Sequence, residues 1–313
     1  MAPGQPACDD GDDNASAAAA IAVHKPRYYR ELEDEAAFLS VADDEGQISI
    51  GGFGSLLSER SARETFPHLR NFRKARLRGF RRIFAHVAPV FFENGVANME
   101  TKEIASLSVE EVDDVNASLI ITVFEIEVKE VPAFIEREHE FRFLVVYPEV
   151  VVEGEEEREV EGEGEEGHVA EEKARKEEEE EKEEDAKKKE GEGEGGGEEE
   201  RGRGRIGPRP AVVCARWDDE SYRRIRCQDD EEYYRLYGRH GVDRVWRDDV
   251  FPCRAYLRHC VIAARNLGAD AYDSFLDNTY LADRVTSIRS HLASNPEIMD
   301  ELPPPEMRTR YGG

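Results

Sequence analysis

The stretch Gln47-Ile-Ser-Ile-Gly-Gly-Phe53-Gly-Ser-Leu-Leu57 decides the fold, because an alternating apolar strand runs directly into a turn crowded with glycine. A glycine backbone can approach a ligand closely, and two or three converging peptide N–H groups bind an anion. Most glycine-rich turns after strands are only turns. This one gains weight from a second segment further along the chain, Pro132-Ala-Phe-Ile-Glu-Arg-Glu138-His-Glu-Phe141.

The second segment carries a candidate catalytic carboxylate, Glu138. If a short helix starts near Pro132, Glu138 lies four residues after Phe134 and on the same inward face, whereas Arg137 projects sideways or outward. A carboxylate on an apolar face has its pKa raised toward neutrality, which suits a general acid or base. The alternative is a structural Glu138 paired with Arg137 or Arg142.

The charge of the chain is concentrated in one segment. The formal net charge of the 313 residues is −27, and 25 acidic against eight basic residues lie between Glu153 and Glu200. We expect 153–205 to be a disordered Glu/Lys/Gly insert, and the Gly/Ala/Asp-rich residues 1–25 to be disordered as well, since neither can bury a core. Strong acidity argues against nucleic acid as the main partner.

The cysteines and the apolar runs indicate the compartment. The five cysteines show no zinc-ligand spacing, so we interpret them as reduced, mostly buried thiols of a cytoplasmic protein. They are Cys8, Cys214, Cys227, Cys253 and Cys260. No apolar run reaches membrane-spanning length, and we expect no membrane partner, no metal and no cofactor.

Alternating apolar residues predict a strand-rich core. The clearest strand is Leu119–Val128, in which Ile120, Thr122, Phe124 and Ile126 share one face and Ile121, Val123, Glu125 and Glu127 share the other. A strand with a bulge at Gly79 is predicted for Lys74–Val87, and further strands for Val90–Phe92 and Ile104–Val109.

The acidic insert lies between two predicted strands, Phe141–Val152 and Pro210–Trp217. The simplest interpretation is a very long surface loop of a hairpin, because loop-closure entropy grows only slowly with length. From Asp218 onward the pattern is helical, and Pro252–Leu267 is the strongest helix, with Gly268 as its stop.

Taken together, the Phe53-Gly-Ser-Leu56 turn and the glutamate-bearing helix before an aromatic strand resemble the gamma-glutamylcyclotransferase-like superfamily, and within it the plant and algal branch. The resemblance implies an α+β fold, a small mixed β-barrel with a C-terminal helical extension. The barrel would comprise 26–152 and 206–225, and the extension 226–313.

The same resemblance implies a reaction and a site. Phe53, Gly54, Ser55 and Leu56 would bind a small γ-glutamyl compound, and Glu138 would move protons while the α-amine of the substrate attacks its own γ-carbonyl, releasing 5-oxoproline and an amine. The chain departs from the family pattern in two places. Phe53 stands where a tyrosine is usual, and His139 follows the glutamate where a glycine is usual.

Two other functions are open on the sequence alone. A non-catalytic binding or scaffold module on the same fold could use the C-terminal helices to hold a protein partner, through Arg254, Tyr256, Arg258 and His259. A basic stripe with interleaved phenylalanines could follow a phosphate backbone, although outward arginines offset by glutamates explain it more simply. The stripe comprises Arg70, Arg73, Lys74, Arg76, Arg78, Arg81 and Arg82.

Overall fold

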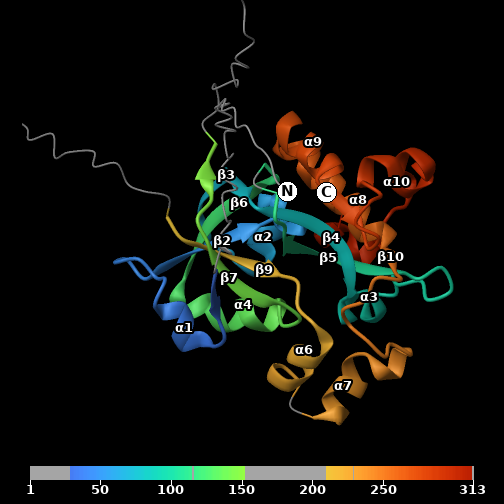
Figure 1. Cartoon of the computed structure of the whole chain (residues 1–313), viewed down its shortest axis with the longest axis horizontal. Coiled ribbons are helices and arrows are strands. Elements are labelled where there is room, and N and C mark those ends of the chain that lie inside the picture. Colours follow the sequence, from blue (N-terminus) through green and yellow to red (C-terminus); the bar gives the residue numbers. More distant parts are fainter. Residues whose placement is uncertain (1–28, 115, 152–208, 228, 312–313) are drawn as a thin grey trace, which may run out of the picture.

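The computed structural model describes residues 29–114, 116–151, 209–227 and 229–311 (Figure 1). The predictions of disorder for 1–25 and 153–205 fall outside these residues. The division of the chain into a barrel, an insert and an extension also stays a prediction.

One large mixed sheet forms the centre of the described structure, with helices around it (Figure 1). Its eleven described strands are β1 (Arg30–Leu32), β2 (Gln47–Gly52), β3 (Arg70–Arg78), β4 (Phe80–Val87), β5 (Glu103–Glu111), β6 (Ser118–Glu127), β7 (Arg142–Val146), β8 (Glu149–Val150), β9 (Ala211–Ala215), β10 (Phe251–Pro252) and β11 (Thr279–Leu281).

The predicted combination of α and β structure is confirmed, but the small closed barrel is not what the described strands form. They follow an open path, β11-β4-β5-β9-β2-β6-β3-β8, from which β7 branches at β9. Strand β9 touches its path neighbours through single parallel pairs, Ile50 with Val212 and Val109 with Ala215. The sheet is therefore larger and more open than the resemblance implies.

The antiparallel pair predicted on either side of the acidic insert is present, but the strand predicted over Phe141–Val152 is divided, because β7 ends at Val146 and β8 pairs with β3 instead. Strands β7 and β9 pair antiparallel over their whole lengths, from Arg142 opposite Ala215 to Val146 opposite Ala211. Both strands are buried almost throughout, which explains why they are nearly continuous apolar runs.

The segment around Gly79 forms two strands rather than one strand with a bulge. Gly79 has φ +77°, a conformation that glycine adopts without strain, and it turns the chain between β3 and β4. Strand β3 pairs with β6 and β4 pairs with β5, so the turn moves the chain to a different part of the sheet.

The strand predicted at Val90–Phe92 is also wrong, because these residues lie in the short helix α3 (Pro89–Glu93). Pro89 occupies the first turn, where its fixed φ favours a helix and its missing N–H costs nothing. Three apolar residues carry too little periodicity to separate a strand from a helical turn.

Helices surround the sheet in groups (Figure 1). Helices α8, α9 and α10 gather on one side, and α6 and α7 lie together below the sheet in this view. The α-helices besides α3 are α1 (Glu35–Leu39), α2 (Glu59–Thr65), α4 (Val131–Arg137), α6 (Asp219–Ile225), α7 (Asp230–Leu236), α8 (Arg254–Leu267), α9 (Ala269–Asp277), α10 (Ile288–Ser294) and α11 (Arg308–Tyr311). The 3-10 turns are η1 (Ser55–Leu57), η2 (Val128–Glu130), η3 (Gly238–His240), η4 (Pro296–Asp300) and η5 (Pro305–Met307).

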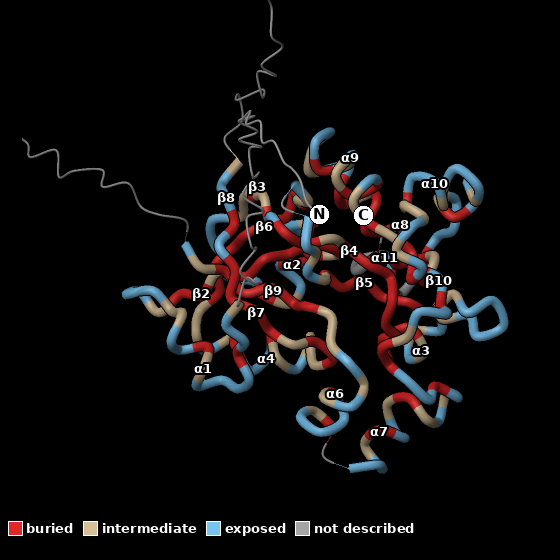
Figure 2. Tube along the Cα trace, viewed as in Figure 1, coloured by how far each residue is buried: buried red, intermediate tan, exposed pale blue. Residues whose placement is uncertain are grey.

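The core lies along the sheet, where the strands are mostly buried while the helix surfaces and connecting loops are more exposed (Figure 2). Strand β6 is buried on both faces, with eight consecutive buried residues. An aromatic cluster packs beside it and holds helix α4 against the sheet. Its members are Phe38, Phe66, Phe124, Phe134 and Phe143.

Candidate active site

A cavity of about 360 Å³ lies at the end of strand β2, and all five residues predicted to form the site line it. They are Phe53, Gly54, Ser55, Leu56 and Glu138. The glycine turn and the second segment are thus brought together in space, although their roles in binding and catalysis stay predictions.

The turn is held by its carbonyl groups. Arg82 Nε donates to the carbonyl of Phe53 at 2.8 Å, and Thr122 Oγ1 donates to the carbonyls of Gly52 at 3.2 Å and Leu56 at 2.8 Å. A trans peptide holds its N–H opposite its C=O. The N–H of Gly54 therefore points away from Arg82.

Arg82 is a cation without exposure to solvent. Besides Phe53, it donates to the carbonyls of Ile120 in β6 and of Ser274 in α9, the latter at 3.3 Å. Burial lowers its pKa to about 9. Arg82 thus joins the turn, the sheet and a C-terminal helix at one buried point.

Two glycines of the turn are required by close packing. A Cβ on Gly52 would lie 2.6 Å from both Leu56 Cβ and Thr122 Oγ1. A Cβ on Gly54 would lie 2.8 Å from the hydroxyl oxygen of Tyr256, a buried residue of α8 that also lines the cavity. No larger side chain fits at either position without movement of its neighbours.

Glu138 follows the last residue of α4, and its backbone N–H donates to Phe134 at 3.0 Å. Arg137 does not project outward as predicted. Its Nε lies 2.7 Å from Glu138 Oε1, Nη2 lies 3.4 Å from Ser55 Oγ, and Nη1 donates to the hydroxyl of Thr65. The pairing of Glu138 with Arg137, the structural alternative, is therefore present inside the cavity itself.

The glutamate that is buried most deeply in the cavity is Glu140 rather than Glu138. Glu140 is buried, with 8% of the residue exposed, whereas Glu138 is half-buried. Burial raises the pKa of Glu140 to about 8, and the negative charge of Glu138 adds to this, so Glu140 carries a proton at neutral pH. The raised pKa expected of this segment is thus found two residues after the predicted position.

A series of hydrogen bonds leads from Glu140 away from the cavity. The Tyr237 hydroxyl bonds to the Glu140 carboxyl and lies 3.1 Å from the Tyr222 hydroxyl, which is 3.3 Å from His139 Nε2. Tyr222 and Tyr237 are both buried, whereas His139 is half-buried. The histidine that departs from the family pattern therefore ends a buried polar network.

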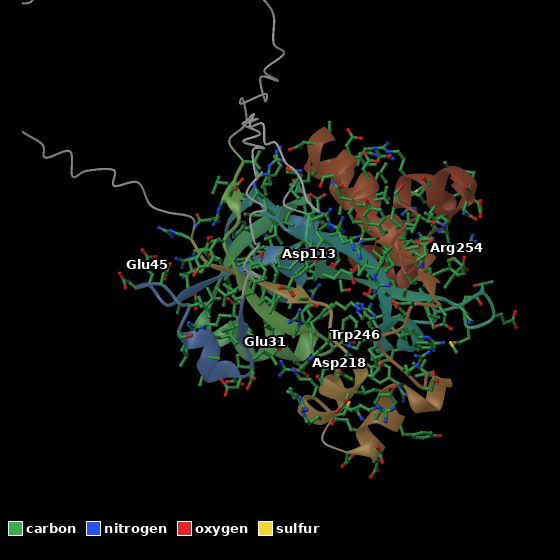
Figure 3. The ribbon with its side chains drawn as sticks, in the orientation of Figure 1. Glu31, Glu45, Asp113, Asp218, Trp246 and Arg254 are labelled. Atoms are coloured by element: carbon green, nitrogen blue, oxygen red, sulfur yellow. The ribbon has the colours of Figure 1, made fainter. Side chains whose placement is uncertain are left out.

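His86 forms another part of the cavity wall. Its ring is fully buried, stacks on Trp246 at 4.6 Å and meets Phe141 edge-on at 4.8 Å. Burial lowers the pKa of His86 to about 3, so the imidazole is neutral. Within the described residues neither ring nitrogen has a hydrogen-bond partner. Figure 3 shows Trp246 close to Asp218, where α6 approaches the sheet.

The polar residues of α8 serve the interior of the fold. Arg254, labelled in Figure 3, pairs with Glu103 at 2.6 Å, and Arg258 donates to the carbonyl of Met299 at 2.9 Å. Tyr256 lines the cavity, and His259 is buried. These contacts give no support to the predicted protein partner.

The basic stripe is largely neutralised within the chain. Arg82 is buried, and four other members form ion pairs: Arg73 with Glu125, Lys74 with Asp270, Arg78 with Glu149, and Arg81 with Glu110. The structure therefore supplies no argument for a nucleic-acid surface along β3 and β4.

Four of the five cysteines fall in the described residues, and all four are free and buried, as predicted. Cys8 lies outside those residues. Cys214 lines the cavity, and burial raises its pKa well above the usual value.

Across the described ranges, no three His, Cys, Asp or Glu side chains are grouped to hold a metal ion. No described helix combines the length and the apolar character that crossing a membrane requires.

Sequence reasoning missed Arg82, His86, Glu140 and Tyr256 as parts of the site. Glu140 had a signal, because it follows Glu138 at a spacing of two in the same segment. Arg82 had no such signal, because it lies among arginines such as Arg78 and Arg81, which pair with acidic residues and are partly exposed. Its burial depends on the packing of α9.

Comparison with known proteins gives limited results. No family model matches the chain, and no curated protein does so either. Two of the solved structures that match in part are an uncharacterized protein from Homo sapiens, with TM-score 0.26 and 15% identity over 34% of this chain and 60% of that one, and a gamma-glutamyl cyclotransferase, with TM-score 0.26 and 13% identity over 35% and 61%.

These matches span about three-fifths of each solved chain. A TM-score of 0.26 identifies no corresponding residues in the present chain. Neither match distinguishes a plant or algal branch.

Proposed function

We propose that the chain is an enzyme of the gamma-glutamylcyclotransferase type, which cleaves a small γ-glutamyl amide by intramolecular aminolysis. The α-amine of the substrate attacks its own γ-carbonyl, the bond to the leaving nitrogen breaks, and 5-oxoproline and a free amine are released. No oxidation state changes, so the reaction needs no redox cofactor. Free, buried thiols support a cytoplasmic location as part of this proposal.

Glu138 would accept the proton that the α-amine loses on attack. The N–H groups of the turn, among them that of Gly54, would polarise the γ-carbonyl and stabilise the negative charge that develops on its oxygen. Arg137, whose Nε lies 2.7 Å from Glu138 Oε1, would orient the carboxylate toward this point.

One observation carries the proposal. A carboxylate and a glycine turn from segments far apart in the sequence line one cavity of about 360 Å³, and Arg137 bridges them by contacting both Glu138 and Ser55. The volume suits a compound of the size of a γ-glutamyl amino acid.

The test is incubation with γ-glutamyl amino acids and glutathione, with 5-oxoproline measured by chromatography. We expect release by the wild type and a loss of about 100-fold or more in Glu138→Gln. Glu136→Gln is the matched control, since Glu136 lies two residues earlier on the exposed side of α4. If the folded wild type released no 5-oxoproline from any γ-glutamyl compound, the proposal that the chain is an enzyme would be wrong.

The second candidate is a binding module on the same fold, and the Arg137–Glu138 ion pair is the observation that favours it, because a neutralised carboxylate is a poorer base. Calorimetry separates the two functions. A binding module would take up a γ-glutamyl compound with no 5-oxoproline formed, and Glu138→Gln would alter affinity alone.

A further inference from the structure

The cavity contains two carboxyl groups in opposite surroundings. Glu138 contacts the guanidinium of Arg137 at 2.7 Å, so a cation lies directly beside its carboxylate. Glu140 lines the same cavity, is 8% exposed and receives its hydrogen bond from the hydroxyl of Tyr237. A carboxylate that contacts a cation and a second carboxyl that is buried are two different environments, and such a pair can divide the roles of base and acid.

We propose that Glu138 and Glu140 divide the proton transfers of the reaction, with Glu138 as the base for the attacking amine and Glu140 as the acid that protonates the leaving nitrogen. This inference rests on the proposed function, in which a single glutamate would otherwise make both transfers. The described cavity gives each transfer a carboxyl group of its own.

The proposed reaction transfers one proton to Glu138 and one proton from Glu140. The α-amine forms a bond to the γ-carbon and loses one proton to Glu138. The bond between the γ-carbon and the leaving nitrogen breaks, its electron pair stays on that nitrogen, and the nitrogen takes the proton of Glu140. After this step Glu138 is protonated and Glu140 is ionised. The starting state returns when Glu138 releases its proton and Glu140 takes one up.

The hydrogen-bonded series beyond Glu140 gives the returning proton a route. Tyr237 and Tyr222 join the Glu140 carboxyl to the half-buried imidazole of His139 through hydroxyls 3.1 Å apart. Hydroxyl groups can accept one proton while donating another. The series therefore connects the buried acid with the edge of the fold without passing through the substrate.

The protonation of Glu140 depends on the groups that face it from each neighbouring element. Burial raises its pKa to about 8, the charges of Glu138 and Glu93 raise it further, and the hydrogen bond from Tyr237 lowers it. Cys214 of β9 and Tyr222 of α6 also interact with its charge. A reaction that needs the acid form is therefore expected to fail as pH rises through about 8.

The experiment compares two leaving groups. An alkylamine must be protonated to leave, whereas p-nitroaniline leaves with little help because it is a very weak base. In Glu140→Gln we expect cleavage of a γ-glutamyl alkylamide to fall by about 100-fold or more, and cleavage of γ-glutamyl p-nitroanilide by less than about tenfold. Glu136→Gln is the matched control, since Glu136 is an exposed carboxyl of the same segment.

A second variant keeps the acid in place. Tyr237→Phe removes the hydrogen bond that lowers the pKa of Glu140, so the alkaline loss of alkylamide cleavage should move to higher pH. In Glu140→Gln that alkaline loss should be absent.

The outcomes separate the two proposals. Equal losses on both leaving groups in a folded Glu140→Gln, or no loss on either, would overturn the division of roles while leaving the enzyme standing. No turnover of either compound by the wild type would overturn the proposed function, and this inference with it.

Discussion

The guanidinium of Arg137 lies 2.7 Å from the carboxylate of Glu138, and the two residues are adjacent in the chain. The same guanidinium also reaches Ser55 in the glycine turn and Thr65 at the end of α2. Arg137 thus sets the distance between the two halves of the proposed site. Catalysis is sensitive to such positioning, because misplacement by about 1 Å can cost on the order of 100-fold in rate.

Replacement of Arg137 by methionine should therefore lower kcat for a γ-glutamyl amide by about 10- to 100-fold, with a smaller change in KM. Lysine should recover part of the loss, since it restores the charge but cannot make all three contacts. Steady-state kinetics measure both effects. Arg63→Met on α2, where Arg63 pairs with Glu59 at the surface, is the control. If the kinetics of Arg137→Met were unchanged, Arg137 would have no role in the proposed site.

Gly54→Ala should destabilise the fold by about 1–3 kcal/mol, because its Cβ would meet the buried hydroxyl of Tyr256 at 2.8 Å. Tyr256→Phe removes that oxygen, so the double variant should regain most of the loss. Gly52→Ala should gain nothing from the same partner, since its obstacles are Leu56 and Thr122. Urea unfolding of the three single variants and of the two doubles with Tyr256→Phe checks this, and additive effects of Gly54→Ala and Tyr256→Phe would contradict the contact.

Glu140→Gln should stabilise the protein at neutral pH. The pKa of Glu140 is raised from 4.5 to about 8 on folding, so its contribution to stability is fully present below pH 4.5 and is lost as pH rises through about 8. The gain in the variant should thus be near zero at pH 4.5 and grow to about 3 kcal/mol at pH 7. Thermal unfolding across this range measures it. A gain that is the same at every pH would exclude Glu140 as its source.

Arg82→Met should destabilise the protein by about 3 kcal/mol or more, because the buried carbonyls of Phe53, Ile120 and Ser274 lose their donor. Arg81→Met is a close control. Arg81 is the preceding residue and pairs with Glu110 while partly exposed, so its loss should cost less than about 1 kcal/mol. Equal losses in the two variants would show that the three carbonyl contacts of Arg82 contribute little.

Much of the sheet could be predicted because its signals are local. The alternation in Leu119–Val128 and the apolar runs on either side of the insert led directly to β6, β7 and β9. Strands β10 and β11 have two and three residues, and they exist because they pair with β5 and β4 far away in the sequence. No local pattern records such a pairing.

The candidate site could likewise be predicted only in part from the sequence. The resemblance singled out the turn and Glu138, and both line one cavity. It could not separate the surroundings of Glu138 and Glu140, because the Glu138 carboxyl contacts Arg137 whereas Glu140 is buried by elements far away in the sequence. Burial of a polar side chain is decided by the elements that pack over it.

The pairing of β7 with β9 has a practical consequence for how the protein could be made. Because Val146 faces Ala211 across the sheet, the two ends of the long segment between them are already joined by backbone hydrogen bonds. A polypeptide ending after β8 and a second one beginning before β9 would each contain one half of the hairpin. Co-expressed as separate chains, the halves should assemble through this strand pair, with the glycine turn supplied by the first chain and Tyr256 by the second.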